Sequence, residues 1–214
     1  HRDPVWNPVE RQFMGWERKR GKLDELNRML RGQPTTSNLR HVGDRGGLER
    51  IRFVITLDAD TQLPMGAAQR LVGLLAHPLN RAIFGEGGRV AAGYTVAQPR
   101  VETSPASCHS TWFARFFAGD TVFDVYTHAV SDTYQDLFGA GIYVGKGIYE
   151  IDTFMRSLQG RVPENWIASH DLFEGIHGRA ALATDIVLYE DFPTSYVAFA
   201  RRNHRWIRGD WQLL

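Results

Sequence analysis

The order of apolar and polar positions along the chain predicts strands that alternate with helices. A mostly apolar, β-branched run over 51–57 is typical of a buried strand. Before and after this run, apolar residues recur every three or four positions over 17–30 and over 66–76, which predicts two helices. Strands separated by helical stretches favour an α/β fold, with a mostly parallel sheet flanked by helices.

The rest of the chain continues this alternation. The further predicted elements are a strand over 89–101 that Gly93 interrupts and Pro99 ends, a mostly helical region over 105–138 with a break at Gly119, a glycine-rich strand and turn over 139–149, a helix over 153–158 that Asp152 caps, a helix that begins near Asp171, a strand over 185–189 and a helix over 195–214. No internal repeat or low-complexity linker divides these elements, so we expect one domain.

Composition narrows the functional classes. The 214 residues are enough for one domain with a core, and a hydrophobic content of 43% is typical of a globular protein. The 25 basic and 24 acidic residues nearly cancel, so the overall charge indicates neither a nucleic acid nor a membrane surface as a partner. Cys108 has no second cysteine to pair with, which excludes an internal disulfide.

The ends of the chain suggest that it is a piece of a longer protein. It starts without Met and stops inside a predicted helix. No apolar run approaches the roughly 20 residues that a membrane-spanning helix needs, and no signal peptide is visible. We therefore expect any membrane attachment of the longer protein to lie outside this chain.

Two carboxylates directly follow the first apolar strand. Asp58 and Asp60 are separated by one residue and stand at the carboxyl end of this strand. Ligands of open α/β sheets bind at this edge, and carboxylate oxygens suit Mg²⁺ or Mn²⁺. The alternative is a solvated acidic turn, but an unpaired carboxylate at the end of a buried strand is unfavourable. We therefore favour a metal or nucleotide site.

A second polar cluster precedes the helix predicted from Asp171. Ser169 and Asp171 are typical N-cap residues, so capping of the free backbone N–H groups is one interpretation. The other makes Asp171 a general base, a role that needs a carboxylate within hydrogen-bond reach of a hydroxyl. His170, Glu174 and His177 are potential metal ligands, but their spacing matches no common zinc motif.

Arginines recur every three residues in the last predicted helix. Arg202, Arg205 and Arg208 lie close to one stripe of this helix, with His204 and Trp206 among them. One interpretation is a solvated face or a helix that lies on a membrane surface. The other is a site that binds an anionic leaving group, with the indole stacked on a sugar.

Taken in order, these segments resemble the motifs of processive, inverting GT-A glycosyltransferases, such as the cellulose, chitin and hyaluronan synthases. Those enzymes carry a Lys/Gly/Asn segment, an Asp-x-Asp pair, a glycine-rich acceptor segment, an acidic base motif and a Gln-x-x-Arg-Trp helix. The matching segments are 19–27, 58–60, 139–147, 169–171 and 202–206. The segments that look most like the glycosyltransferase region of cyclic β-1,2-glucan synthases are 17–22, 55–64, 147–152 and 169–175.

The resemblance implies a GT-A-like, Rossmann-like fold and a reaction. Glucose would pass from UDP-glucose to a growing, β-1,2-linked glucan by a single, inverting displacement. Asp60, with Asp58, would hold Mg²⁺ or Mn²⁺ on the UDP diphosphate, and Asp171 would deprotonate the acceptor hydroxyl. Arg205 and Arg202 would stabilise the departing diphosphate.

The resemblance also implies roles for residues around these groups. Those expected near the nucleotide are Lys19, Lys22 and Asn27, and those expected to line the acceptor site are Gly139, Gly141, His170 and Trp206. Two positions depart from the family pattern. Arg202 stands where Gln is usual, and His170 stands where Glu is usual before the base.

The wider protein is also implied by the resemblance. Residues 1–214 would be part of a glycosyltransferase domain of a large, multidomain protein of the bacterial inner membrane. This domain would face the cytoplasm. The first nucleotide-binding strand, with its own Asp, is expected upstream of His1, so the fold would be truncated at its N-terminus and the piece inactive alone.

Two other classes of protein fit some of these residues. A carbohydrate-binding or regulatory module would keep the fold without catalysis. A metal phosphohydrolase would use Asp58, Asp60, His170 and His177, and it requires His177 to converge on the two aspartates. The glycosyltransferase requires only that Asp171 faces these aspartates across a gap the size of a sugar.

Overall fold

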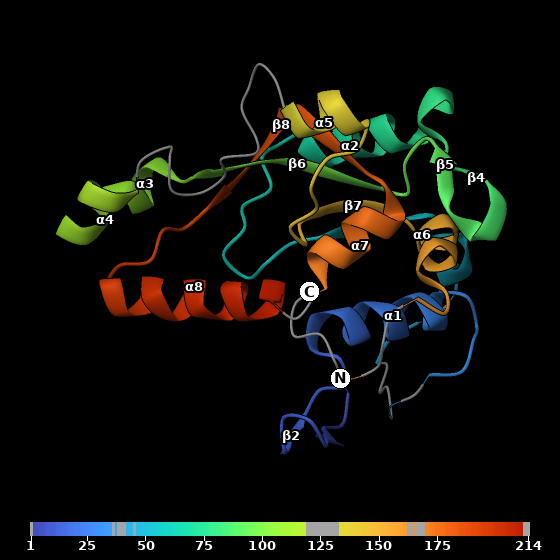
Figure 1. The fold of residues 1–214 in the computed structure, drawn as a ribbon, viewed down its shortest axis with the longest axis horizontal. Helices are drawn as coiled ribbons and strands as arrows, with labels where there is room; N and C mark the ends of the chain where they lie inside the picture. The colour runs from blue at the N-terminus through green and yellow to red at the C-terminus, as the bar shows by residue number, and fades with distance from the viewer. Residues whose placement is uncertain are drawn as a thin grey trace.

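A four-stranded sheet forms the centre of the molecule (Figure 1). The computed structural model describes residues 2–35, 37, 42–44, 46–118, 133–161, 165 and 170–211. The strand order is β3-β7-β6-β8, and the strands are β3 (Phe53–Thr56), β6 (Val96–Thr103), β7 (Gly147–Glu150) and β8 (Ala180–Glu190). The predicted α/β class is confirmed.

The prediction of a mostly parallel sheet is wrong. Strand β7 runs antiparallel to both β3 and β6, and among the described strands of this sheet only β6 and β8 are parallel. An apolar run has the same pattern in either direction. The sequence therefore indicated the strands but not the orientation of β7.

Helices and smaller elements surround the sheet. The helices are α1 (Arg18–Leu30), α2 (Ala67–Ala76), α3 (Pro105–Cys108), α4 (Trp112–Phe117), α5 (Thr133–Phe138), α6 (Ile151–Leu158), α7 (Asp171–Gly178) and α8 (Tyr196–Trp211). The short 3₁₀ helices are η1 (Leu48–Arg50), η2 (Pro78–Asn80) and η3 (Glu86–Gly88). Two hairpins pair β1 (Val5–Asn7) with β2 (Gln12–Met14) and β4 (Ile83–Phe84) with β5 (Val90–Ala92). No helix in the described part of the chain has the length and apolarity to cross a membrane.

The sheet has an apolar core on each face. Leu71 of α2 packs with Ile148 and Leu188 on one face. Leu30 of α1 packs with Tyr149 on the other face, where α6 also contributes. Ile148 and Tyr149 are neighbours in β7, and their side chains point to opposite faces because strand side chains alternate. In Figure 1, α1 lies below the strands, whereas α2 lies above β7, at the level of β6 and β8.

Several predicted elements agree with the structure. The predicted helices over 17–30 and 66–76 are α1 and α2, and the predicted strand over 51–57 contains β3. Two other elements begin as expected: α7 starts at Asp171, and α8 covers the described part of the predicted helix over 195–214. Apolar periodicity was sufficient for α1 and α2 because each helix buries one side against the sheet.

Pro99 does not end its strand, contrary to the prediction. Strand β6 continues to Thr103, and the ladder between β6 and β8 shifts register after Pro99. The partner of Pro99 is Ala183, whereas the partner of Arg100 is Val187. Proline lacks the N–H that a regular ladder needs, and an irregularity in the ladder accommodates it.

Asp152 does not cap α6, which is a second correction. The helix begins at Ile151, two residues before the predicted start, so Asp152 lies in its first turn. The Asp152 carboxylate instead accepts two hydrogen bonds from Arg31 at the end of α1, from Nε at 2.6 Å and from Nη2 at 3.0 Å. Asp152 was expected to cap α6, but its side chain instead connects α6 to the end of α1.

The boundaries of other elements differ from the predictions. The strand predicted over 185–189 is longer, because β8 begins at Ala180. Of the glycine-rich segment over 139–149, only the end from Gly147 belongs to a regular strand. The described part of the region over 105–138 contains three short helices, and the predicted break at Gly119 lies outside the described residues. The hairpin of β1 and β2 was not predicted.

Candidate active site

A cleft of about 500 Å³ opens beyond the end of β3. It is lined by Arg18, Lys19, Arg20, Asp58, Ala59, Asp60, Lys146, His170, Asp171, Glu190, Arg202, Arg205 and Trp206. These residues come from the start of α1, the segment after β3, the turn before β7, the start of α7, the end of β8 and the middle of α8. The cleft therefore brings together residues from all five sequence segments that were expected to share a site.

Asp58 is held by lysines from two different elements. Lys19 of α1 places its Nζ 2.5 Å from Asp58 Oδ1 and donates a second hydrogen bond to the carbonyl of Gly145 at 2.7 Å. Lys146 places its Nζ 3.5 Å from Asp58 Oδ2. The side chains of Lys19 and Asp58 are both partly exposed, so this charge cluster is accessible from the cleft.

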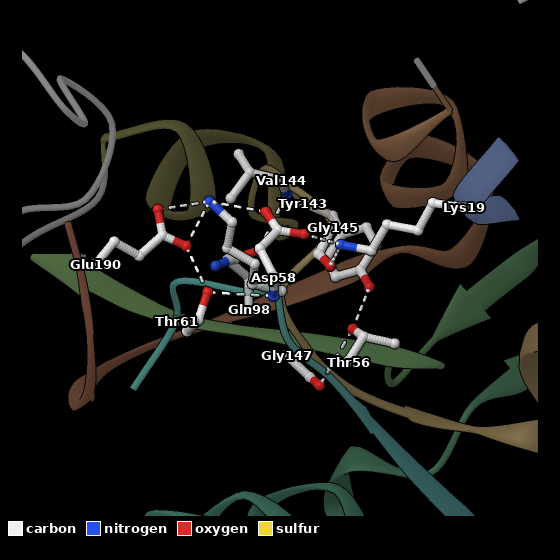
Figure 2. Close-up of polar contacts among 11 residues, drawn as sticks. Lys19, Thr56, Asp58, Thr61, Gln98, Tyr143, Val144, Gly145, Gly147 and Glu190 are labelled. Carbon is white, nitrogen blue, oxygen red and sulfur yellow. Dashed lines mark hydrogen bonds and ion pairs between the residues drawn. The ribbon is translucent and has the colours of Figure 1, made fainter. Parts of the chain in front are cut away.

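A buried ion pair lies next to Asp58. Lys146 Nζ is 2.7 Å from one carboxylate oxygen of Glu190 and 2.8 Å from the other. Glu190 also accepts a hydrogen bond from the hydroxyl of Thr61 at 2.7 Å. Figure 2 shows Lys19 and Glu190 on opposite sides of Asp58, with Thr61 beside Glu190.

Sequence reasoning missed Lys146 and Glu190. Lys146 lies inside the glycine-rich segment, and Glu190 ends an apolar strand. A charged residue that directly follows a buried strand was the signal that singled out Asp58, and the same signal was present at Glu190. Unlike Asp58, Glu190 does not belong to a recognisable motif.

Hydrogen bonds fix the turn that carries Gly145 and Lys146. The N–H of Val144 donates to the Gln98 side chain at 2.9 Å, and the hydroxyls of Tyr143 and Thr56 are 3.1 Å apart. Tyr143, Thr56 and Gln98 are all buried. The turn is therefore attached to both β6 and β3 from beneath, and it forms a firm floor for the cleft (Figure 2).

Asp171 also lines the cleft, as the first residue of α7. Burial raises the pKa of its carboxyl, and nearby Asp58 acts in the same direction, whereas Lys19, Lys146 and His170 act against them. A carboxylate with a raised pKa is a stronger base than an ordinary aspartate. Its position in the cleft suits it to take a proton from a bound hydroxyl.

His170 belongs to the wall of the cleft, but its ring nitrogen is directed elsewhere. His170 Nε2 lies 3.0 Å from Glu17 Oε2, and both residues are buried. Burial alone would raise the pKa of Glu17, but the imidazole and the N–H of Asn165 lower it below its usual value. His170 therefore ties the start of α7 to the start of α1.

The basic helix α8 forms the outer wall. Arg202 lies over the ring of Trp206, with 4.8 Å between its Cζ and the ring centroid, and also near Phe192. Burial lowers the pKa of Arg202, while the charges of Glu190 and Asp60 act to raise it. Arg202, Arg205 and Trp206 thus present two cations and one aromatic face to the cleft.

Four of the expected site residues lie away from the cleft. Asn27 is buried and accepts a hydrogen bond from the Tyr149 hydroxyl at 2.8 Å, so it supports the core. Lys22 is exposed on α1 and does not line the cleft. The remaining two are Gly139 and Gly141, of which Gly141 donates its N–H to the Ala180 carbonyl.

His177 does not lie near Asp58 and Asp60 in the structure. His177 lies on α7 with its Nδ1 3.2 Å from Arg161 and its ring 4.3 Å from that of Phe173. It does not line the cleft that contains Asp58 and Asp60. The arrangement required for the metal phosphohydrolase is therefore not present among the described residues.

The donor set fits a divalent cation that arrives with a phosphate ligand. Among the described residues, no group of three or more His, Cys, Asp or Glu side chains is placed to hold a metal alone. Mg²⁺ in nucleotide sites needs only one or two carboxylates, because phosphate oxygens and water complete its shell. Asp60 is exposed at the cleft and Asp58 is partly exposed, so both are accessible for this purpose.

Comparison with known proteins agrees with the sequence motifs. The whole chain aligns with a segment of the cyclic beta-(1,2)-glucan synthase NdvB of Rhizobium meliloti (strain 1021), at 47% identity over 216 residues. The chain spans only 8% of the length of that protein. No protein-family model matches the chain. The predicted resemblance to cyclic β-1,2-glucan synthases is thus confirmed.

Proposed function

We propose, from the premise that this chain is homologous to a segment of a cyclic β-1,2-glucan synthase, that it forms most of a glycosyltransferase site. The donor would be UDP-glucose and the acceptor a growing β-glucan, and the mixed sheet would belong to a GT-A fold. The observation that carries the proposal is that Asp58 and Asp171 line one cleft from different elements, with Trp206 beside them. A diphosphate site and a base are what such a transfer needs.

The acceptor side of the reaction is assigned to Asp171. Its carboxylate would take the proton of an acceptor hydroxyl, whose oxygen attacks the anomeric carbon from the side opposite the diphosphate. The bond between this carbon and the diphosphate oxygen breaks in the same step. An α-linked donor then gives a β-linked product, and the proton remains on Asp171 until it passes to solvent.

The donor side of the reaction is assigned to other charged residues of the cleft. Lys19, Arg202 and Arg205 would bind the diphosphate, since charge-assisted hydrogen bonds favour phosphate oxygens. Asp58 and Asp60 would hold Mg²⁺ or Mn²⁺, which supplies positive charge to the leaving diphosphate when bound. Trp206 offers an aromatic face on which a sugar ring of the acceptor would stack.

The wider setting is part of the same proposal. The chain would act as one segment of a longer synthase at the bacterial inner membrane, on the cytoplasmic side where nucleotide sugars are made. Membrane attachment would come from segments outside this chain. A carbohydrate-binding module on the same fold would not need a base such as Asp171. Substitution of Asp171 therefore distinguishes a glycosyltransferase from such a module.

Transfer of radiolabelled glucose from UDP-glucose by the full-length protein, followed by linkage analysis, tests the proposal. We expect labelled β-glucan from the unaltered protein. Asp171→Asn should abolish transfer and leave UDP binding nearly unchanged, because it removes the base and not the diphosphate site. Undiminished glucan synthesis by Asp171→Asn would show that another group is the base.

A further inference from the structure

Lys146 and Glu190 have no part in the mechanism above, although both lie at the floor of the cleft. Both side chains are buried, with residue exposures of 7% and 4%. The ammonium of Lys146 lies between two carboxylates but is shared unequally. It is 2.7 Å and 2.8 Å from the two oxygens of Glu190 and 3.5 Å from Asp58.

Glu190 also fixes the backbone of the Asp58 segment. The Thr61 hydroxyl donates to Glu190 at 2.7 Å and accepts from the N–H of Asp58 at 3.2 Å. The main chains of Gln62 and Tyr189 exchange two hydrogen bonds, of 2.7 Å and 3.2 Å. The segment that carries both aspartates is therefore attached to the end of β8 through its backbone and through one carboxylate.

Lys146 lies closer to Glu190 than to Asp58, and this difference matters because Asp58 is already paired with Lys19. Lys19 contacts Oδ1 of Asp58 at 2.5 Å, which leaves Oδ2 as the oxygen that Lys146 approaches. A buried ammonium that loses its counter-ion is strongly destabilised, so it moves to the nearest remaining carboxylate. Without the charge of Glu190, that carboxylate is Asp58, and both of its oxygens would then be paired with lysines.

We propose that Glu190 is a positioning residue that holds Lys146 away from Asp58, so that one oxygen of Asp58 stays accessible to a divalent cation. The inference rests on the proposed function, because it presumes cation-dependent binding of a nucleoside diphosphate in this cleft. Glu190 itself contacts neither the cation nor the nucleotide. It acts by fixing the position of one lysine.

A double-mutant cycle on the full-length protein tests this role. UDP binding is measured by calorimetry at a series of Mg²⁺ concentrations for the unaltered protein, Glu190→Gln, Lys146→Met and the double variant. We expect Glu190→Gln to raise the Mg²⁺ concentration needed for half-maximal binding by about tenfold, the size of coupling found between neighbouring charges. The double variant should return to within about threefold of the unaltered protein, because the competing lysine is gone.

Recovery of the Mg²⁺ response in the double variant would distinguish a positioning role of Glu190 from a merely structural one. If Glu190 served only to stabilise the fold, removal of Lys146 as well would not restore the response to Mg²⁺. A double variant that binds as poorly as Glu190→Gln therefore overturns the inference. Mn²⁺ binding followed by electron paramagnetic resonance in the presence of UDP gives a second readout that does not depend on turnover.

Control variants keep the test decisive. Asp185→Asn removes a carboxylate from the same strand, where Asp185 pairs with Arg70 on the exposed surface, and it should leave the Mg²⁺ response unchanged. If Glu190→Gln does not fold, Lys146→Met alone must bind UDP and Mg²⁺ at least as well as the unaltered protein, and weaker binding overturns the inference. Absence of UDP binding by the unaltered protein would instead contradict the proposed function.

Discussion

Gly145 lies against the carboxylate of Asp171 so closely that a Cβ atom on Gly145 would be 2.6 Å from Asp171 Oδ1. Gly145 also has a φ of +82°, in the left-handed region that favours glycine. Its carbonyl accepts the hydrogen bond from Lys19. One glycine therefore separates the proposed base from the lysine that pairs with Asp58.

Gly145→Ala should move Asp171 and disturb transfer. The added methyl has no space beside the carboxylate, so either Asp171 or the turn must shift, and misplacement by about 1 Å can lower turnover by roughly a hundredfold. Glucose transfer by the full-length protein measures the effect. Gly73→Ala is the control, because a Cβ on Gly73 meets nothing within 4 Å. This control should keep full activity and add roughly 0.5–1 kcal/mol to helix stability.

Asp60→Ala should reduce metal-dependent UDP affinity as well as turnover. Asp60 is the more exposed of the two aspartates, and a direct carboxylate ligand to a metal contributes at least as much as an outer-shell partner, about tenfold or more in affinity. Calorimetry of UDP binding with and without Mg²⁺ checks this. Equal stimulation by Mg²⁺ in Asp60→Ala and in the unaltered protein would remove Asp60 from the proposed cation site.

Glu174 should make the stability of the chain depend on pH. It is buried one turn after Asp171, and burial, with a further contribution from the Asp171 charge, raises its pKa from 4.5 to about 8. The folded state then binds more protons than the unfolded state between these values, so stability falls as pH rises through this window.

Substitution of Glu174 by Gln should remove this dependence. Between pH 5 and pH 9 the free energy of unfolding should fall less in Glu174→Gln than in the unaltered chain, by on the order of a few kcal/mol. Urea unfolding at the two pH values measures the difference. Glu86→Gln, at an exposed position, is the matched control and should retain the fall. An unchanged pH dependence in Glu174→Gln would assign the raised pKa to another group.

The Arg31 and Asp152 pair should contribute a modest stability that disappears in acid. The two hydrogen bonds from Arg31 lower the pKa of Asp152, so this contribution is present above the usual aspartate pKa and is lost as pH falls through the lowered value. Because Asp152 is largely exposed, Asp152→Asn should cost only about 0.5–1 kcal/mol at pH 7.

A comparison of two substitutions checks the geometry of this pair. Arg31→Lys keeps the charge but loses the second parallel hydrogen bond, so it should show part of the loss. Urea unfolding at pH 7 and pH 2 measures both variants. A loss for Asp152→Asn that is equally large at pH 2 would mean that Asp152 acts through packing and not through its charge.

The sequence predicted those parts of the site that depend on local spacing. Asp58, Asp171 and Arg202 each belong to a short motif, and the structure brings all three to one cleft. The Lys146 and Glu190 pair could not be found in this way, because the two residues are 44 positions apart and meet only through the order of the strands. Asn27 is the opposite case: its place in a motif predicted a role near the nucleotide, but its side chain accepts a hydrogen bond from the Tyr149 hydroxyl in the core.

The fold was predictable to a similar extent. The helices α1 and α2 follow from apolar periodicity, which is a property of neighbouring residues. The orientation of β7 depends on how the chain returns from α5, and the register shift at Pro99 depends on its partner β8. The strand orientation and the register shift are both set by contacts between segments that are distant in the sequence. The periodicity of apolar residues does not predict such contacts.

The parallel pairing of β6 with β8 has a consequence for how the protein folds. Val96 pairs with Ala180, so the chain must close a long loop before this ladder can form, and such closures are slow. Lys146 and Asp171 both lie within that loop, and Glu190 arrives at the cleft only with the last strand. We therefore expect ligand binding to appear only in the slowest phase of refolding, after the helices have formed.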